Sequence, residues 1–188
     1  MSPIQVGIPK SGELMAGWVL DLAYALRRIP RVAIADAAWG GSTLNYINPT
    51  IGGGTSFTTI TGWLQARLAA LALRGRCEPP ILVCYEGANG DGSTTPWAAG
   101  MTQVMAGFRG IWPGMPVICM KVPSGSDYPA NLTEQRASVD TYVAGDPLSR
   151  VVDVSPGSFF DLNLHIDQTC GRLFAQGVAA AAIDIWGL

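Results

Sequence analysis

The sequence predicts one α/β domain, residues 1–188, built on a parallel sheet that helices cover on both faces. Two observations lead to this prediction: strand-like and helix-like stretches alternate along all 188 residues, and the strand-like stretches are apolar throughout. Strands of a sheet covered on both sides are apolar on both faces, because neither face meets water. No change in composition, repeat or low-complexity linker divides the chain, and its length suits one domain with a sizeable core.

Each predicted strand is a short apolar run that a predicted helix follows. The five strands are PIQVGI (3–8), RVAIADA (31–37), PILVCYE (80–86), MPVICMKV (115–122) and RVVDV (150–154). The five helices are expected over 13–28, 61–74, 94–112, 131–145 and 167–186, with a Gly/Thr-rich loop over 48–59 before the second. In the first helix, apolar residues recur at every fourth position and predict one buried stripe. They are Leu14, Trp18, Leu22 and Leu26.

The composition limits the classes of partner. The net charge is −2 and no basic run occurs, which argues against nucleic acid and anionic membrane as partners. No apolar stretch is as long as a membrane span, and no signal sequence is recognisable at the N-terminus. Charged residues make up only 14% of the chain, which suits exported or assembled proteins. The compartment stays open, with an extracellular or virion-associated location among the alternatives.

The cysteines and the lone histidine argue against a metal site. Cys77, Cys84, Cys119 and Cys170 are scattered without the CxxC spacing of zinc sites, and the chain has one histidine. Cysteines inside predicted strands behave as small buried apolar residues. We therefore expect structural cysteines, no metal and no cofactor.

Polar residues follow several predicted strands, where open parallel sheets bind their ligands. Ser11 follows the first strand, Gly41 the second, Asn89 the third and His165 the fifth. Acyl transfer needs a nucleophile, a base and hydrogen-bond donors for the oxyanion. A serine and a histidine can supply the first two, while a glycine N–H and an asparagine amide can supply donors without adding a charge. Each residue could instead serve a turn or a helix cap.

The order Ser, Gly, Asn, His resembles the SGNH (GDSL-type) hydrolase family. Four segments carry the resemblance: KSGELMAGW (10–18), ADAAWGGSTL (35–44), YEGANGDG (85–92) and DLNLHIDQTCGRLFAQGVA (161–179). The second and third segments, together with NLTEQRASVDTYV (131–143), are similar to sequences of the carbohydrate esterase and sialate O-acetylesterase-like branch. The resemblance implies a three-layer α/β/α sandwich of flavodoxin-like type, with a five-stranded parallel sheet in the order 2-1-3-4-5.

The resemblance also implies the roles of the site residues. Ser11 is the expected nucleophile and His165 the base. The backbone N–H groups of Ser11 and Gly41 and the side chain of Asn89 form the expected oxyanion hole. The family places an orienting Asp three residues before the histidine, where this chain has a leucine. Asp161 lies four residues before His165, so it can take this role only if the loop bulges.

Three further residues are weaker candidates for substrate contacts. Glu86 lies beside the expected site, where it either positions substrate or simply ends a strand. Trp39 and Trp97 lie next to site loops and could stack on a sugar, whereas the helical spacing of Trp18, Trp63 and Trp112 favours the core.

The resulting functional prediction is a serine esterase. Its expected substrate is an acylated, in particular acetylated, carbohydrate or a small ester. The alternative is a non-catalytic descendant, a structural or glycan-binding domain, for example of a viral particle. Both leave open a homo-oligomer or a larger assembly.

Overall fold

A three-stranded parallel sheet forms the centre of the part of the chain that the structure describes. The computed structural model describes residues 21–27, 47–50, 55–72, 80–85, 97–126, 132–161 and 165–187. The sheet has the order β1 (Leu82–Cys84), β2 (Val117–Met120), β3 (Ser149–Val152), with Val83 opposite Ile118 and Ile118 opposite Arg150. These are the third, fourth and fifth predicted strands, and their parallel pairing is confirmed. The first two predicted strands, 3–8 and 31–37, lie outside the described residues.

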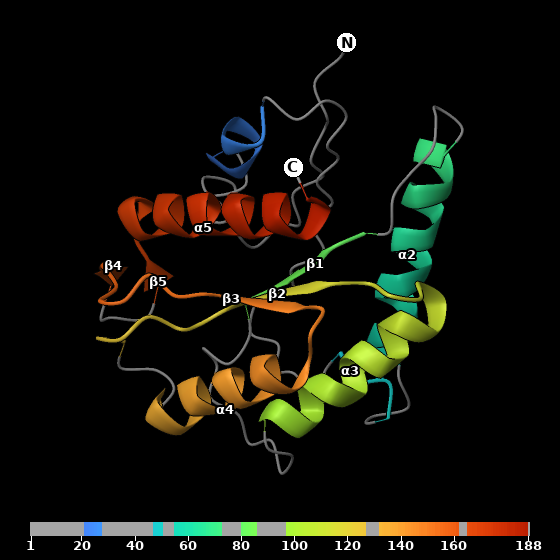
Figure 1. Ribbon diagram of the computed structural model, residues 1–188, viewed down its shortest axis with the longest axis horizontal. Coiled ribbons are helices and arrows are strands. Elements are labelled where there is room, and N and C mark those ends of the chain that lie inside the picture. The colour runs from blue at the N-terminus through green and yellow to red at the C-terminus, as the bar shows by residue number, and fades with distance from the viewer. Residues whose placement is uncertain are drawn as a thin grey trace.

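Helices cover both faces of this sheet (Figure 1). Helix α5 (Gln168–Trp186) lies on one face, together with the helical residues 21–25. Helices α3 (Trp97–Ile111) and α4 (Leu132–Gly145) lie on the other, and α2 (Thr55–Ala72) packs beside α3. The molecule therefore has the α/β architecture and the layered arrangement that the apolar strands predict.

Strand β2 shows why these strands are apolar on both faces. All four of its residues are buried. Val117 and Cys119 point into the cluster formed with α3 and α4, whereas Ile118 and Met120 point into the cluster formed with α5. This alternation follows from the two-residue repeat of a strand, and burial of each such side chain contributes about 1.5–3 kcal/mol.

The first predicted helix is described only at its end, over residues 21–25. Leu22 and Leu26 are each 4% exposed and pack against the α5 cluster. These two members of the predicted stripe are therefore confirmed as buried, while Leu14 and Trp18 lie outside the described residues.

The later helices agree closely with the sequence pattern. Helix α5 begins after Asp167, which caps its first turn, and ends at Gly187, whose φ of 67° is the left-handed conformation that glycine adopts easily. Helices α3 and α4 begin and end within a few residues of the predicted bounds.

The predicted start of α2 is wrong. We expected a loop up to residue 59, but the helix begins at Thr55. Phe57 packs edge-to-face on Phe108 of α3, with 5.2 Å between ring centres, and Ile60 joins the same cluster. This packing outweighs the modest helix propensity of the threonine-rich stretch.

A second correction concerns the segment after β3, which we expected to be a loop. It contains two short antiparallel strands, β4 (Phe159–Asp161) and β5 (His165–Ile166). The sequence signal is weak because the strands are short. Backbone pairing across the connecting residues, rather than side-chain periodicity, defines them.

The described cysteines are structural, as predicted. Cys84, Cys119 and Cys170 are buried. Burial raises the pKa of the Cys119 thiol to about 12, and the nearby Asp146 adds to the increase, so this thiol stays neutral. Cys77 lies outside the described residues. Among the helices that the structure describes, none is long and apolar enough to cross a membrane.

Candidate active site

The predicted site residues divide into two groups. Ser11, Gly41, Asn89, Glu86 and Trp39 lie outside the described residues. His165 and Asp161 are described through the backbone of the antiparallel β4–β5 ribbon, and Trp97 begins helix α3.

The ribbon lies at the edge of the sheet where the sequence places a site. It follows β3 and leads directly into α5, so it lies beyond the carboxyl end of β3 and beside the first turn of α5 (Figure 1). This is the edge at which open parallel sheets bind ligands. The single histidine of the chain therefore lies at the carboxyl edge of the sheet.

An irregularity in the ribbon brings Asp161 and His165 opposite each other. Phe159 pairs with Ile166, and regular antiparallel pairing would then place residue 160 opposite His165. The register instead shifts between Phe159 and Asp161, so that Asp161 pairs with His165. One extra residue on β4 produces this shift, as in a β-bulge. The backbone of Asp161 thus lies opposite that of His165.

The start of the segment that carries the ribbon is held by Asp153, directly after β3. One carboxylate oxygen of Asp153 accepts hydrogen bonds from the Ser155 N–H at 3.1 Å and the Ser155 hydroxyl at 2.6 Å. The other accepts a hydrogen bond from Arg136 of α4 and lies 3.9 Å from Lys121 Nζ. Burial raises the pKa of Asp153, but the hydrogen bonds from Ser155 and Arg136 lower it more, so the net pKa is below its ordinary value.

Lys121, directly after β2, is a mostly buried cation that pairs with an exposed carboxylate. Its side chain is only 10% exposed, and Nζ lies 2.6 Å from Asp140 of α4. Arg136 also donates to the Val122 carbonyl. The cations and carboxylates of this cluster neutralise one another and connect α4 to the ends of β2 and β3.

The loops after β2 and β3 are joined by backbone contacts. The Ser124 N–H donates to the Ser155 hydroxyl at 2.9 Å, and the Gly157 N–H donates to the Ser124 carbonyl at 2.9 Å. A Cβ on Gly157 would lie 2.3 Å from Cβ of Pro123. Only glycine allows the two loops to approach this closely.

Trp97 does not fit the predicted role of a sugar platform. It is 9% exposed and packs edge-to-face on Tyr142, with 6.0 Å between ring centres. The ring therefore belongs to the core between α3 and α4, where its large apolar area is best used. Trp112, which we expected in the core, stacks on Phe108.

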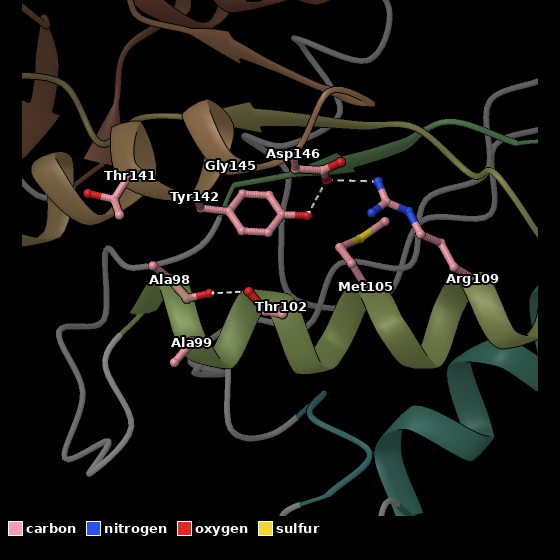
Figure 2. Close-up of a pocket in the computed structure, with 9 residues that line it drawn as sticks. All are labelled: Ala98, Ala99, Thr102, Met105, Arg109, Thr141, Tyr142, Gly145 and Asp146. Carbon is pink, nitrogen blue, oxygen red and sulfur yellow. Dashed lines mark hydrogen bonds and ion pairs between the residues drawn. The ribbon is translucent and has the colours of Figure 1, made fainter.

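A separate groove of about 350 Å³ lies between α3 and α4 (Figure 2). Asp146 lines this groove and accepts hydrogen bonds from Arg109 at 2.8 Å and from the Tyr142 hydroxyl at 2.7 Å. The Leu148 N–H donates to the other carboxylate oxygen. Burial raises the pKa of Asp146, but these hydrogen bonds lower it more, and the carboxylate stays ionised. Asp146 precedes β3, so this groove and the ribbon lie at opposite ends of the strand.

Sequence reasoning missed the cluster of Lys121, Arg136 and Asp153. Lys121 and Asp153 both fall inside predicted strands, which in fact end at Met120 and Val152. A charged residue at the end of an apolar run is the one signal that pointed to either of them. Within the part of the chain that the structure describes, no three His, Cys, Asp or Glu side chains are grouped as metal ligands would be.

Comparison with known proteins identifies the fold. No protein-family model matches the sequence, and no curated protein matches it significantly. The structure is similar to that of a protein from Arabidopsis thaliana, with a TM-score of 0.69 and 16% identity over 87% of this chain and 66% of that one. It is also similar to a carbohydrate esterase of family 3 from Talaromyces cellulolyticus, with a TM-score of 0.62 and 14% identity over 91% and 92% of the two chains. The chain thus shares the fold of a carbohydrate esterase.

Proposed function

We propose that this protein is a serine esterase that removes acyl groups, in particular acetyl groups, from a carbohydrate. The likeness in fold to a carbohydrate esterase over 91% of the chain supports an esterase of SGNH type. The observation that carries the proposal is the bulged register, which pairs the only histidine with Asp161 at the carboxyl edge of the sheet. The motifs around Gly41 and Asn89 favour the sialate O-acetylesterase-like branch.

In the proposed first step, Ser11 Oγ attacks the ester carbonyl while His165 takes its proton. The N–H groups of Ser11 and Gly41 and the amide of Asn89 hold the oxyanion of the tetrahedral intermediate. The C–O bond to the sugar then breaks, and His165 returns the proton to the sugar oxygen. An acyl group remains on Ser11.

In the second step a water molecule gives its proton to His165 and attacks the acyl-enzyme. The carboxylic acid leaves, and Ser11 recovers its proton from His165. Asp161 keeps the imidazole in the orientation and tautomer that both steps require, as the acidic member of a catalytic triad does. Glu86 and Trp39 are candidates for contacts with the sugar.

Turnover of p-nitrophenyl acetate tests the proposal. We expect Ser11→Ala and His165→Ala each to lower kcat by at least about 10³-fold, and the double variant to be hardly worse than either, because the pair acts as a unit. Ser138→Ala, a half-buried serine of α4, is the matched control and should keep the rate. Full activity of Ser11→Ala would contradict the proposal. A folded wild type without turnover on acetyl esters would favour the non-catalytic, glycan-binding alternative.

A further inference from the structure

We propose that Ser158 and Asp167 form a clasp that fixes the backbone position of His165. The clasp consists of these two residues and the hydrogen bonds between them, and both are positioning residues for the proposed reaction. The inference rests on the proposed function, because it assigns these residues an effect on the catalytic base.

Two hydrogen bonds close the clasp. The Ser158 hydroxyl donates to Oδ1 of Asp167 at 2.6 Å, and the Asp167 N–H donates to the Ser158 carbonyl at 3.0 Å. Ser158 directly precedes β4, and Asp167 directly follows β5. The clasp therefore joins the two open ends of the ribbon, and Asp161 and His165 lie inside the closed segment.

Asp167 also ties the ribbon to helix α5. The same carboxylate oxygen that binds Ser158 accepts a hydrogen bond from the Cys170 N–H at 2.9 Å, which caps the helix. The Asp167 carbonyl accepts a hydrogen bond from the Gly171 N–H at 2.9 Å. Helix α5 is firmly seated, because Phe174 and Val178 are almost completely buried against the sheet. The clasp thus fixes the two-residue strand β5 relative to helix α5.

The other end of the segment is held independently of the clasp. Asp153 and Ser155 anchor it to α4 and to the loop after β2. Those anchors lie before Ser158, so they hold the start of the segment, whereas the clasp joins the two strands of the ribbon. His165 is only two residues from Asp167, and Ile166 between them packs against the α5 cluster.

A short segment with a bulge needs such a clasp if it presents a catalytic base. Catalytic groups must be held within about 0.5 Å of the productive geometry, and a misplacement of about 1 Å can lower the rate about 100-fold. Isolated two-stranded ribbons are marginally stable in water. Without the hydroxyl of Ser158, this end of the ribbon would lose the side-chain hydrogen bond that joins its two strands and keep the backbone bond.

Ser158→Ala tests the inference because it removes one hydroxyl and leaves Asp167 free to cap α5. We expect kcat for p-nitrophenyl acetate to fall about 10- to 100-fold, with KM within about twofold and a thermal midpoint lowered by less than about 4 °C. Ser158→Thr restores the hydroxyl and should restore most of kcat. Thr141→Ala is the matched control, because it removes an exposed hydroxyl that bonds only within α4, to the Ala137 carbonyl.

A readout without turnover separates this inference from the proposed function. His165 is the only histidine, so its imidazole NMR signals need no assignment. We expect Ser158→Ala to shift or broaden these signals and Thr141→Ala to leave them unchanged, whether or not the wild type hydrolyses esters. Unchanged imidazole signals and an unchanged kcat in Ser158→Ala would overturn the clasp. A loss of thermal stability alone, with the signals and kcat retained, would also overturn it and make the bond purely structural.

Discussion

Asp146 and Asp153 lie just outside the two ends of β3, one before the strand and the other after it, in different surroundings. Asp146 is enclosed between α3 and α4, where Arg109, Tyr142 and a backbone N–H use its carboxylate (Figure 2). Asp153 is one-third exposed and binds Arg136 and Ser155, in the segment that leads to the ribbon.

An aspartate can therefore stabilise the whole fold at one end of a strand, as Asp146 does, and order only the following loop at the other end, as Asp153 does. The enclosed carboxylate joins two helices to the sheet, so its loss affects the whole domain. The exposed carboxylate orders a short segment, so its loss affects mainly the position of His165.

Replacing Asp146 should cost the most stability. Asp146→Ala removes the acceptor of the Tyr142 hydroxyl and of Arg109 Nη2 in a mostly buried site, and we expect the free energy of unfolding to fall by about 2–4 kcal/mol. Urea denaturation measures this loss. Tyr142→Phe removes only one of the hydrogen bonds and should cost about 1 kcal/mol. Equal losses in the two variants would show that Asp146 is not the centre of this contact.

Adding a methyl group at Gly157 should disturb the carboxyl end of the strand. The new Cβ would lie 2.3 Å from Cβ of Pro123, so the two loops must move apart. We expect Gly157→Ala to lower the free energy of unfolding by about 1–3 kcal/mol and also to lower esterase activity. Gly110→Ala is the matched control, because nothing lies within 4 Å of its Cβ position. A neutral Gly157→Ala would mean that the close approach of the loops has no consequence.

Replacing Asp153 should affect activity more than stability. Its pairs are partly exposed, so we expect Asp153→Ala to cost about 1 kcal/mol of stability and to lower kcat about tenfold. Asp140→Ala removes the ion pair with Lys121 and leaves the bonds of Asp153 to Arg136 and Ser155 in place, so it should keep kcat. A larger loss of stability in Asp153→Ala than in Asp146→Ala would contradict the division between the two ends.

Acid should weaken both ends of β3. The pKa values of Asp146 and Asp153 lie below the ordinary value in the folded protein, so these carboxylates stabilise the fold above the unfolded pKa of about 3.9. That stability is lost as pH falls through the lower pKa of the folded state. We expect the free energy of unfolding to be level near pH 7 and to fall below about pH 4. Asp146→Asn should remove part of this dependence, and an unchanged pH profile in that variant would show that Asp146 contributes nothing to it.

The sequence predicted the parts of the fold that short local patterns define. The apolar run of β2 and the helical stretch of α5 are local signals, and both elements lie where they were expected. The start of α2 was missed because Phe57 and Ile60 hold it through contacts with another helix. Trp97 was misjudged because its position next to a loop does not reveal that Tyr142 covers it.

The candidate site was only partly predictable, because part of it depends on contacts between residues that are distant in the sequence. The position of His165 at the carboxyl edge follows from the order of strands and helices, which is visible in the sequence. The register that pairs it with Asp161 depends on a bulge, and a bulge is a backbone feature that no residue type announces. The contact between Arg136 and Asp153 joins residues on different elements, so no local pattern contains it.

Covalent labelling tests the central claim most directly, namely that Ser11 and His165 form a catalytic pair. A fluorophosphonate reacts with an activated serine, which displaces fluoride and leaves the phosphonyl group on Oγ. Mass spectrometry of the digested protein should find one adduct per chain, on Ser11, and labelling should be lost in both Ser11→Ala and His165→Ala. Labelling of a different serine, or equal labelling of wild type and His165→Ala, would contradict the account.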